Sequence, residues 1–153
     1  MTKQNSQDYI FNMECLGTAK EIFDAILNVR GWWSGLYSEE IEGSTDKLND
    51  EFTFRAGNGA HYSKQKLTEL VPESKVVWLV TDSNLTFLEK PDEWIGTKIC
   101  FEISIPDNNG KDTKIHVRFT HQGLLPDIEC YNSCSSAWSQ YMQQFQLNLN
   151  NKK

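Results

Sequence analysis

The last part of the chain carries its longest helical pattern. From residue 131 onward, large apolar side chains recur at steps of three and four, at Tyr131, Cys134, Trp138, Tyr141, Met142, Phe145 and Leu149. Such steps place side chains on one stripe of an α-helix, and polar residues occupy the opposite side. The pattern predicts a long C-terminal helix with Asp127 as its N-cap. Its apolar stripe needs a large apolar partner.

The first 35 residues predict a strand and a helical segment. Residues 8–15 alternate apolar and polar side chains, as a half-buried strand does. Thr18 and Glu21 have the spacing of a capping box, which predicts a helix over residues 19–28. Residues 31–35 predict a turn or a short second helix. The adjacent tryptophans there, 32 and 33, cannot share one helical face, so we expect one in the core and the other partly exposed or lining a cavity.

The middle of the chain has the alternation of strands. Turn sequences separate the predicted strands. The first of these strands ends at residue 43, and the others cover residues 51–57, 61–70, 75–82, 96–105 and 113–121. Residues 84–95 predict a loop anchored by Leu85, Phe87 and Trp94. The order of strand, helix pair, run of strands and terminal helix predicts an α+β fold. We expect a curved antiparallel sheet wrapped around the long C-terminal helix, with residues 1–153 forming one domain.

Composition excludes several classes of partner. The chain has 153 residues, 39% of them hydrophobic, and a net charge of −6. No cluster of Lys and Arg alternates with aromatic residues, which argues against nucleic acid and anionic membrane surfaces. No apolar run approaches the ~20 residues that span a bilayer, so no membrane insertion is expected. The polar N-terminus lacks the apolar core of a signal peptide, so we expect a cytoplasmic protein with reduced cysteines.

Several ordered segments carry a resemblance to a known family. The chain resembles the Hsp90-ATPase-activator-homologue group of the START-like, or Bet v 1-like, superfamily. The resemblance covers nearly the whole chain and rests on residues 31–33, 41–43, 67–72, 76–78, 93–97, 119–124 and 129–131, with Cys134 and Trp138. It implies a helix-grip fold with a hydrophobic pocket between the sheet and the C-terminal helix.

The resemblance leaves three functions open. The superfamily includes lipid and polyketide carriers, cyclases, coenzyme-binding proteins and co-chaperone domains. A binding protein for a small hydrophobic, lipid-like or polyketide-like molecule comes first, and we expect no enzymatic activity and no cofactor. The alternatives are an interaction domain for an Hsp90-type chaperone and a cyclase- or hydrolase-type enzyme. Either a monomer or a homodimer agrees with the sequence.

Strand and helix phase select the side chains that face this pocket. The predicted lining residues are Trp32, Trp33, Phe52, Phe54, His61, Trp78, Phe101, Phe119, His121, Tyr131, Cys134, Trp138 and Met142. For each of them, ordinary core packing is the alternative interpretation. Arg55 and His61 flank a glycine-rich hairpin, and either could supply a polar contact at the pocket mouth.

Few residues suggest chemistry. His121 is a weak catalytic candidate, because an imidazole can bind a ligand head group or act as a general base. The alternative is a hydrogen bond to backbone that fixes the turn into the terminal helix. Cys130 and Cys134 are four positions apart, but a zinc site would need further ligands. We therefore expect two buried, apolar thiols there, with no metal and no disulfide.

Overall fold

Among the described residues, seven antiparallel strands form one curved sheet. The computed structural model describes residues 8–33, 38–57, 60–86, 88–104, 114–125 and 131–151. The strands lie in the order β1-β7-β6-β5-β4-β3-β2. Their bounds are β1 Tyr9–Leu16, β2 Glu40–Gly43, β3 Glu51–Ala56, β4 His61–Val71, β5 Lys75–Leu85, β6 Lys98–Ser104 and β7 Lys114–Gln122. The apolar β5 strand is central in this order, as predicted.

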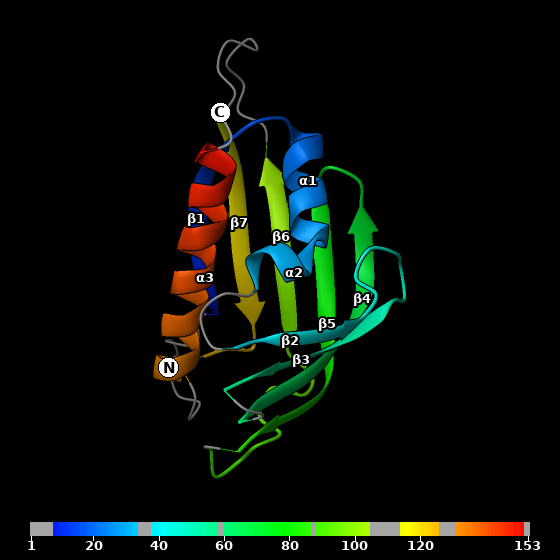
Figure 1. The fold of residues 1–153 in the computed structure, drawn as a ribbon, viewed down its shortest axis with the longest axis vertical. Helices are drawn as coiled ribbons and strands as arrows, with labels where there is room; N and C mark the ends of the chain where they lie inside the picture. The colour runs from blue at the N-terminus through cyan, green and yellow to red at the C-terminus, as the bar shows by residue number, and fades with distance from the viewer. Residues whose placement is uncertain are drawn as a thin grey trace, which may run out of the picture.

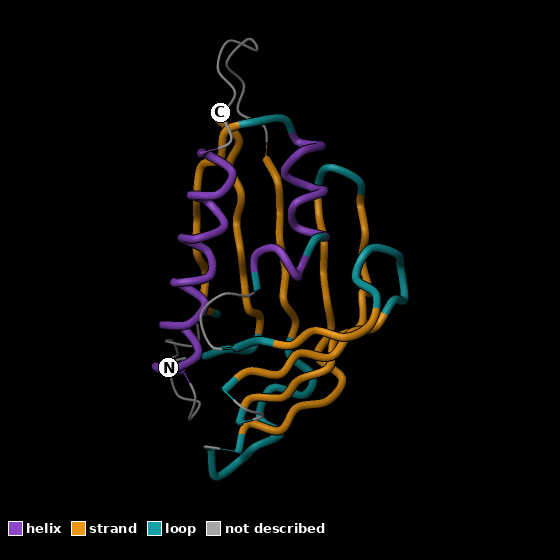
Figure 2. Tube along the Cα trace, viewed as in Figure 1, coloured by secondary structure: helices purple, strands orange, loops and turns teal. Residues whose placement is uncertain are grey.

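In the described part of the chain, three helices cover one face of the sheet. They are α1 (Ala19–Leu27), α2 (Val29–Trp32) and α3 (Tyr131–Asn151). Figure 1 shows α3 lying along β1 and β7, with α1 beside it over β5 and β6. The β2–β3–β4 end of the sheet curves across below α1 and α2, which Figure 2 shows as a bent group of strands. This arrangement confirms the predicted helix-grip fold. Among the described helices, none has the length and apolar character needed to cross a membrane.

The predicted capping box starts α1. Thr18 Oγ1 accepts a hydrogen bond from the Glu21 backbone N–H at 3.1 Å, and Glu21 Oε1 accepts from the Thr18 N–H at 3.0 Å. Both bonds satisfy amides that the first turn leaves free. The helix then buries Ile22, Phe23 and Ile26 against the sheet.

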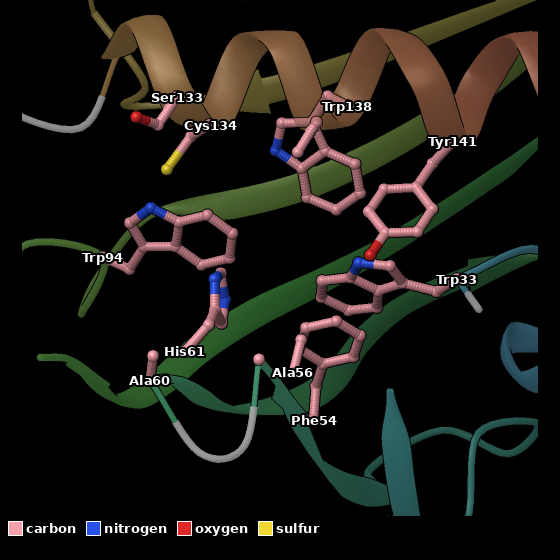
Figure 3. A pocket seen from close by; sticks show the side chains of 12 residues that line it. Trp33, Phe54, Ala56, Ala60, His61, Trp94, Ser133, Cys134, Trp138 and Tyr141 are labelled. Atoms are coloured by element: carbon pink, nitrogen blue, oxygen red, sulfur yellow. The ribbon is translucent and has the colours of Figure 1, made fainter. Parts of the chain in front are cut away.

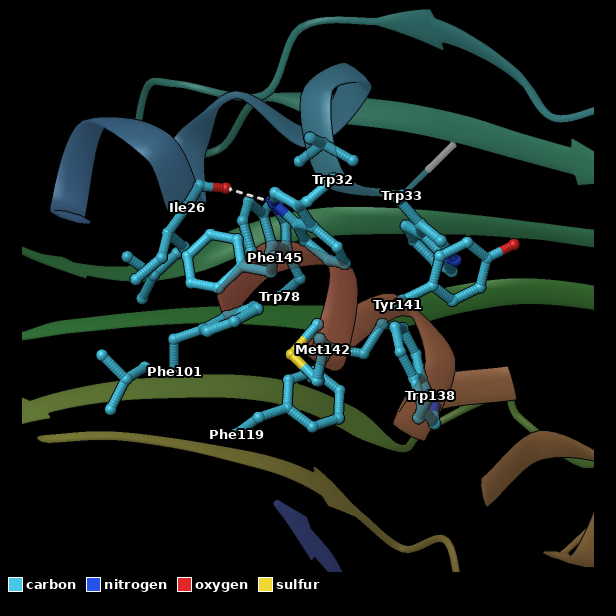
Figure 4. Close-up of a cluster of buried hydrophobic side chains, with 14 of the residues drawn as sticks. Ile26, Trp32, Trp33, Trp78, Phe101, Phe119, Trp138, Tyr141, Met142 and Phe145 are labelled. Carbon is cyan, nitrogen blue, oxygen red and sulfur yellow. Dashed lines mark hydrogen bonds between the residues drawn. The ribbon is translucent and has the colours of Figure 1, made fainter. Parts of the chain in front are cut away.

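The two adjacent tryptophans are both buried. Their rings are stacked, with centroids 5.7 Å apart and planes 7° apart. This is possible because α2 ends at Trp32, while Trp33 has a non-helical backbone with φ −96° and ψ 56°. Trp32 Nε1 donates to the Ile26 carbonyl at 2.9 Å, the dashed bond in Figure 4. Neither ring is exposed, and Trp33 lines the cavity described below.

The apolar stripe of α3 packs onto the sheet as the sequence predicts. Cys134, Trp138, Tyr141, Met142, Phe145 and Leu149 are buried, and Tyr131 is half-buried. Under the middle of the helix, Phe101 and Phe119 meet with ring centroids 5.1 Å apart, and Met142 is fully buried above them (Figure 4). This part of the interface is filled by side chains. The predicted N-cap, Asp127, lies outside the described residues.

Candidate ligand-binding site

A cavity of about 260 Å³ lies under the first half of α3. Figure 3 shows its walls: α3 on one side, the β3–β4 hairpin on the other, and Trp94 from the loop after β5 at one end. The lining residues are Trp33, Phe54, Ala56, Gly57, Ala60, His61, Trp94, Ser133, Cys134, Ala137, Trp138 and Tyr141. Since most of these are aromatic or small and apolar, the cavity suits an apolar molecule.

Flat rings form the walls of the cavity. Trp33 stacks on Phe54, with centroids 3.9 Å and planes 15° apart. The planes of Trp94 and Trp138 are 14° apart, at a centroid distance of 6.1 Å. The space between these rings exists because the neighbouring positions carry the small residues Ala56, Gly57, Ala60 and Ala137. The empty volume therefore results from small side chains lying between the large aromatic ones.

His61 is a polar residue that lines the cavity. It begins β4 opposite Ala56 of β3, and its ring meets Trp94 edge-on at 4.7 Å and 85°. Its Nε2 is buried and has no hydrogen-bond partner among the described residues. An unpaired buried polar group costs about 1–3 kcal/mol. Burial also lowers the pKa of His61 to about 4, so the imidazole is neutral at pH 7.

A carboxylate lies next to the cavity wall. The Tyr141 hydroxyl donates a hydrogen bond of 2.6 Å to Glu39 Oε2. None of the described residues that line the cavity is Lys or Arg. Among the described residues at the cavity, the nearby charge is therefore negative, which disfavours an anionic ligand. Arg55, the other predicted polar contact, stacks over the ring of Tyr62 at 4.8 Å and does not line the cavity.

His121 belongs to a buried chain of hydrogen bonds. The Trp138 indole N–H donates to His121 Nδ1 at 2.9 Å, and His121 Nε2 lies 2.8 Å from Thr97 Oγ1. Because an indole nitrogen can only donate, Nδ1 accepts and Nε2 carries the proton. Nε2 then donates to Thr97, whose hydroxyl donates to the Trp94 carbonyl at 2.6 Å. Every polar atom of the imidazole is thus paired.

This pairing explains the electrostatics of His121 and limits its chemistry. The side chain is fully buried, and burial, followed by the charge of His61, lowers its pKa to about 3. His121 does not line the cavity, and its lone pair is already used by Trp138. The alternative to a ligand contact was a bond to backbone, but the partners are the side chains of Thr97 and Trp138. His121 links α3 to the loop that carries Trp94.

Replacing Thr97 by valine tests this link. The change removes the acceptor of the His121 Nε2–H without altering side-chain shape much, so we expect the free energy of unfolding to fall by about 1–3 kcal/mol. Thr97→Ser is the matched control, because it keeps the hydroxyl. Urea unfolding of both variants measures the difference. Equal losses in the two variants would mean that the hydrogen bond contributes nothing.

The predicted pocket residues divide into two groups. Five line the cavity: Trp33, Phe54, His61, Cys134 and Trp138. The remaining eight do not line it: Trp32, Phe52, Trp78, Phe101, Phe119, His121, Tyr131 and Met142. Most of this second group belong to the hydrophobic core between the sheet and α3. The interface of helix and sheet is thus filled under the middle of α3 and hollow near its start.

Several lining residues were not selected from the sequence. Trp94 was predicted as a loop anchor, and its buried ring closes one end of the cavity. The alanines at 56, 60 and 137, with Gly57, give no chemical pattern, although small residues at inward positions could have indicated where space remains. Two further buried polar atoms, Gln65 Oε1 and Trp78 Nε1, lack partners among the described residues, but neither residue lines the cavity.

The cysteines differ from expectation at one position. Cys134 is disulfide-bonded, and its partner lies outside the described residues, as does Cys130. The prediction of a reduced thiol there is wrong, because it relied on the expected cell compartment and not on which thiols lie within reach. Cys15 and Cys100 are free, and burial raises the pKa of Cys15 to about 12 and that of Cys100 to about 11. Within the described ranges no group of three or more His, Cys, Asp or Glu side chains could hold a metal ion.

The fold is shared with known structures. No family model matches the chain, and no curated protein does. The Aha1 dimer structure from Colwellia psychrerythraea aligns with a TM-score of 0.71 at 20% identity, covering 94% of this chain and 96% of that one. A crystal structure from Mesorhizobium loti aligns with a TM-score of 0.71 at 14% identity, covering 96% and 99%.

A third similar structure comes from a biosynthetic locus. DynU16, of the dynemicin biosynthetic locus, aligns with a TM-score of 0.58 at 8% identity, and the match covers 94% of this chain but 47% of DynU16. All three identities are low, so these likenesses show the fold and not the function. The chain has the helix-grip fold of the Aha1-like proteins that its sequence resembles.

Proposed function

We propose that this protein binds a small, largely apolar molecule in the cavity under the first half of α3. The observation that supports the proposal is the cavity itself: a space of about 260 Å³ walled largely by tryptophan and phenylalanine rings, next to an interface that is filled under the middle of α3. Empty apolar cavities of roughly 150 Å³ already bind benzene. A space of this size therefore suits a molecule with one aromatic ring or with two fused rings.

Binding without catalysis fits the polar groups better than an enzymatic role does. His121, the weak catalytic candidate, has both nitrogens engaged by protein side chains. His61 lines the cavity with a neutral imidazole, which can position a ligand. Binding to an Hsp90-type chaperone stays an expectation from the resemblance, since no described feature of the cavity bears on it.

Filling the cavity tests the proposal. Ala137 lines the cavity from α3, so Ala137→Phe places a ring in the space and is expected to weaken naphthalene binding at least about tenfold through the loss of buried contact area. Ser136→Phe is the matched control, because Ser136 is the preceding helix residue and is exposed. Titration followed by the tryptophan indole resonances in NMR measures both affinities. Naphthalene binding of equal strength in the wild type and Ala137→Phe would contradict the proposal.

A further inference from the structure

His61 lines the cavity, and its buried Nε2 has no hydrogen-bond partner among the described residues. Of the three histidines of the chain, His121 bonds Thr97 and Trp138, and His116 Nε2 lies 3.0 Å from Asn12 Oδ1. Each of these two has a protein partner. His61 Nε2 has none among the described residues, so its partner can be supplied by a bound molecule.

Two aromatic neighbours fix the orientation of the His61 ring. Trp94 meets it at 4.7 Å and 85°, and Phe54 meets it at 5.2 Å and 83°. Figure 3 shows the imidazole between these rings, on the hairpin side of the cavity opposite α3. A ring held on two sides presents its nitrogen in a defined direction, so little rotational freedom is lost when a ligand bonds to it.

The aromatic walls of the cavity favour a planar ligand. The Trp33–Phe54 stack and the nearly parallel Trp94 and Trp138 rings offer flat surfaces, against which a planar aromatic molecule makes more contact than a flexible chain of equal mass. The small volume also disfavours long acyl chains.

The electrostatics select against negative charge. Glu39 is held against the cavity wall by the Tyr141 hydroxyl at 2.6 Å, and no Lys or Arg is among the described lining residues. The imidazole of His61 is neutral near pH 7, because burial lowers its pKa to about 4. A ligand carboxylate would meet no Lys or Arg among the described lining residues and would lose its hydration on entry.

We infer that the ligand class is a neutral, planar aromatic alcohol of one or two rings, whose hydroxyl bonds to His61 Nε2. A hydroxyl can donate to a bare imidazole nitrogen or accept from a protonated one, so it fits either neutral tautomer. This inference rests on the proposed function and adds the chemical class of the molecule.

Three matched probes test the inference: 2-naphthol, naphthalene and 2-naphthoate, each titrated into the protein at pH 7 and followed by calorimetry. We expect 2-naphthol to bind about tenfold more tightly than either of the others, as the gain of one buried hydrogen bond and the cost of a buried charge suggest. His61→Phe keeps a ring but removes the nitrogen, and should remove the preference for 2-naphthol over naphthalene.

A second measurement uses only the wild-type protein, so its result does not depend on whether His61→Phe folds. In the wild type, the ¹⁵N resonance of His61 Nε2 should shift on addition of 2-naphthol and much less with naphthalene. If naphthalene binds but 2-naphthol gains nothing, or if 2-naphthoate binds as tightly as 2-naphthol, the inference is wrong and the apolar cavity proposal stands. If none of the three probes binds, the proposed function fails and the inference fails with it.

Discussion

Trp138→Ala is expected to lower the free energy of unfolding by about 3–5 kcal/mol, the range for removing a buried tryptophan. Trp138 is 2% exposed and lies at the junction of the core and the cavity. Its ring centroid is 4.6 Å from that of Phe119 and 5.0 Å from that of Trp33. The substitution also leaves His121 Nδ1 without its donor. The loss of buried contact area and the unpaired buried nitrogen therefore both lower the free energy of unfolding.

Urea unfolding monitored by far-ultraviolet circular dichroism measures the loss. The control is Leu147→Ala on the same helix, where the side chain is 58% exposed and a change within about 0.5 kcal/mol is expected. A loss below about 1 kcal/mol for Trp138→Ala would show that this ring does not anchor α3 to the sheet.

Acidification is the second large expected effect. The folded-state pKa of His121 is about 3, below the ordinary value of 6.5. Between these two pH values the unfolded chain takes up a proton that the folded chain does not. The contribution of His121 to the free energy of unfolding is therefore complete above pH 6.5 and declines as the pH falls, by up to about 1.4 kcal/mol per pH unit. His61, with a pKa lowered to about 4, acts in the same direction.

His121→Gln isolates this effect. Glutamine offers an amide NH₂ donor group and a carbonyl acceptor in place of the N–H and the bare nitrogen of the neutral imidazole, but it does not titrate. Between pH 6.5 and 5, where most carboxylates stay ionised, the wild type should lose stability more steeply than the variant. His121→Leu removes both hydrogen bonds and should be about 1–3 kcal/mol less stable than the wild type at pH 7. Equal pH slopes for the wild type and His121→Gln would contradict the assigned pKa.

The fold could be predicted because its patterns are local and regular. The capping box of Thr18 and Glu21, the apolar stripe of α3 and the alternation in β7 each correspond to one period of secondary structure. The inward phase of His121 was also predicted, and the residue is fully buried. Its partners were not, since Thr97 and Trp138 are 24 and 17 residues away and their positions depend on tertiary packing.

The cavity was harder to predict because it depends on the sizes of neighbouring side chains. Strand phase identified Phe101 and Phe119 as inward, and helix phase identified Met142. All three are inward, but they fill the space that they face. The hollow lies where Ala56 and Ala137 occupy inward or half-inward positions. Periodicity shows which way a side chain points, whereas an unfilled volume is decided by packing between several distant elements.

Native mass spectrometry of the protein purified from its own host tests the central claim most directly. We expect a bound small molecule whose mass disappears on denaturation, and which is absent when Ala137→Phe is purified in the same way. Fragmentation of that molecule should reveal an aromatic ring system. A wild-type mass equal to that of the bare chain, together with no binding of naphthalene or 2-naphthol, would contradict the ligand-binding account.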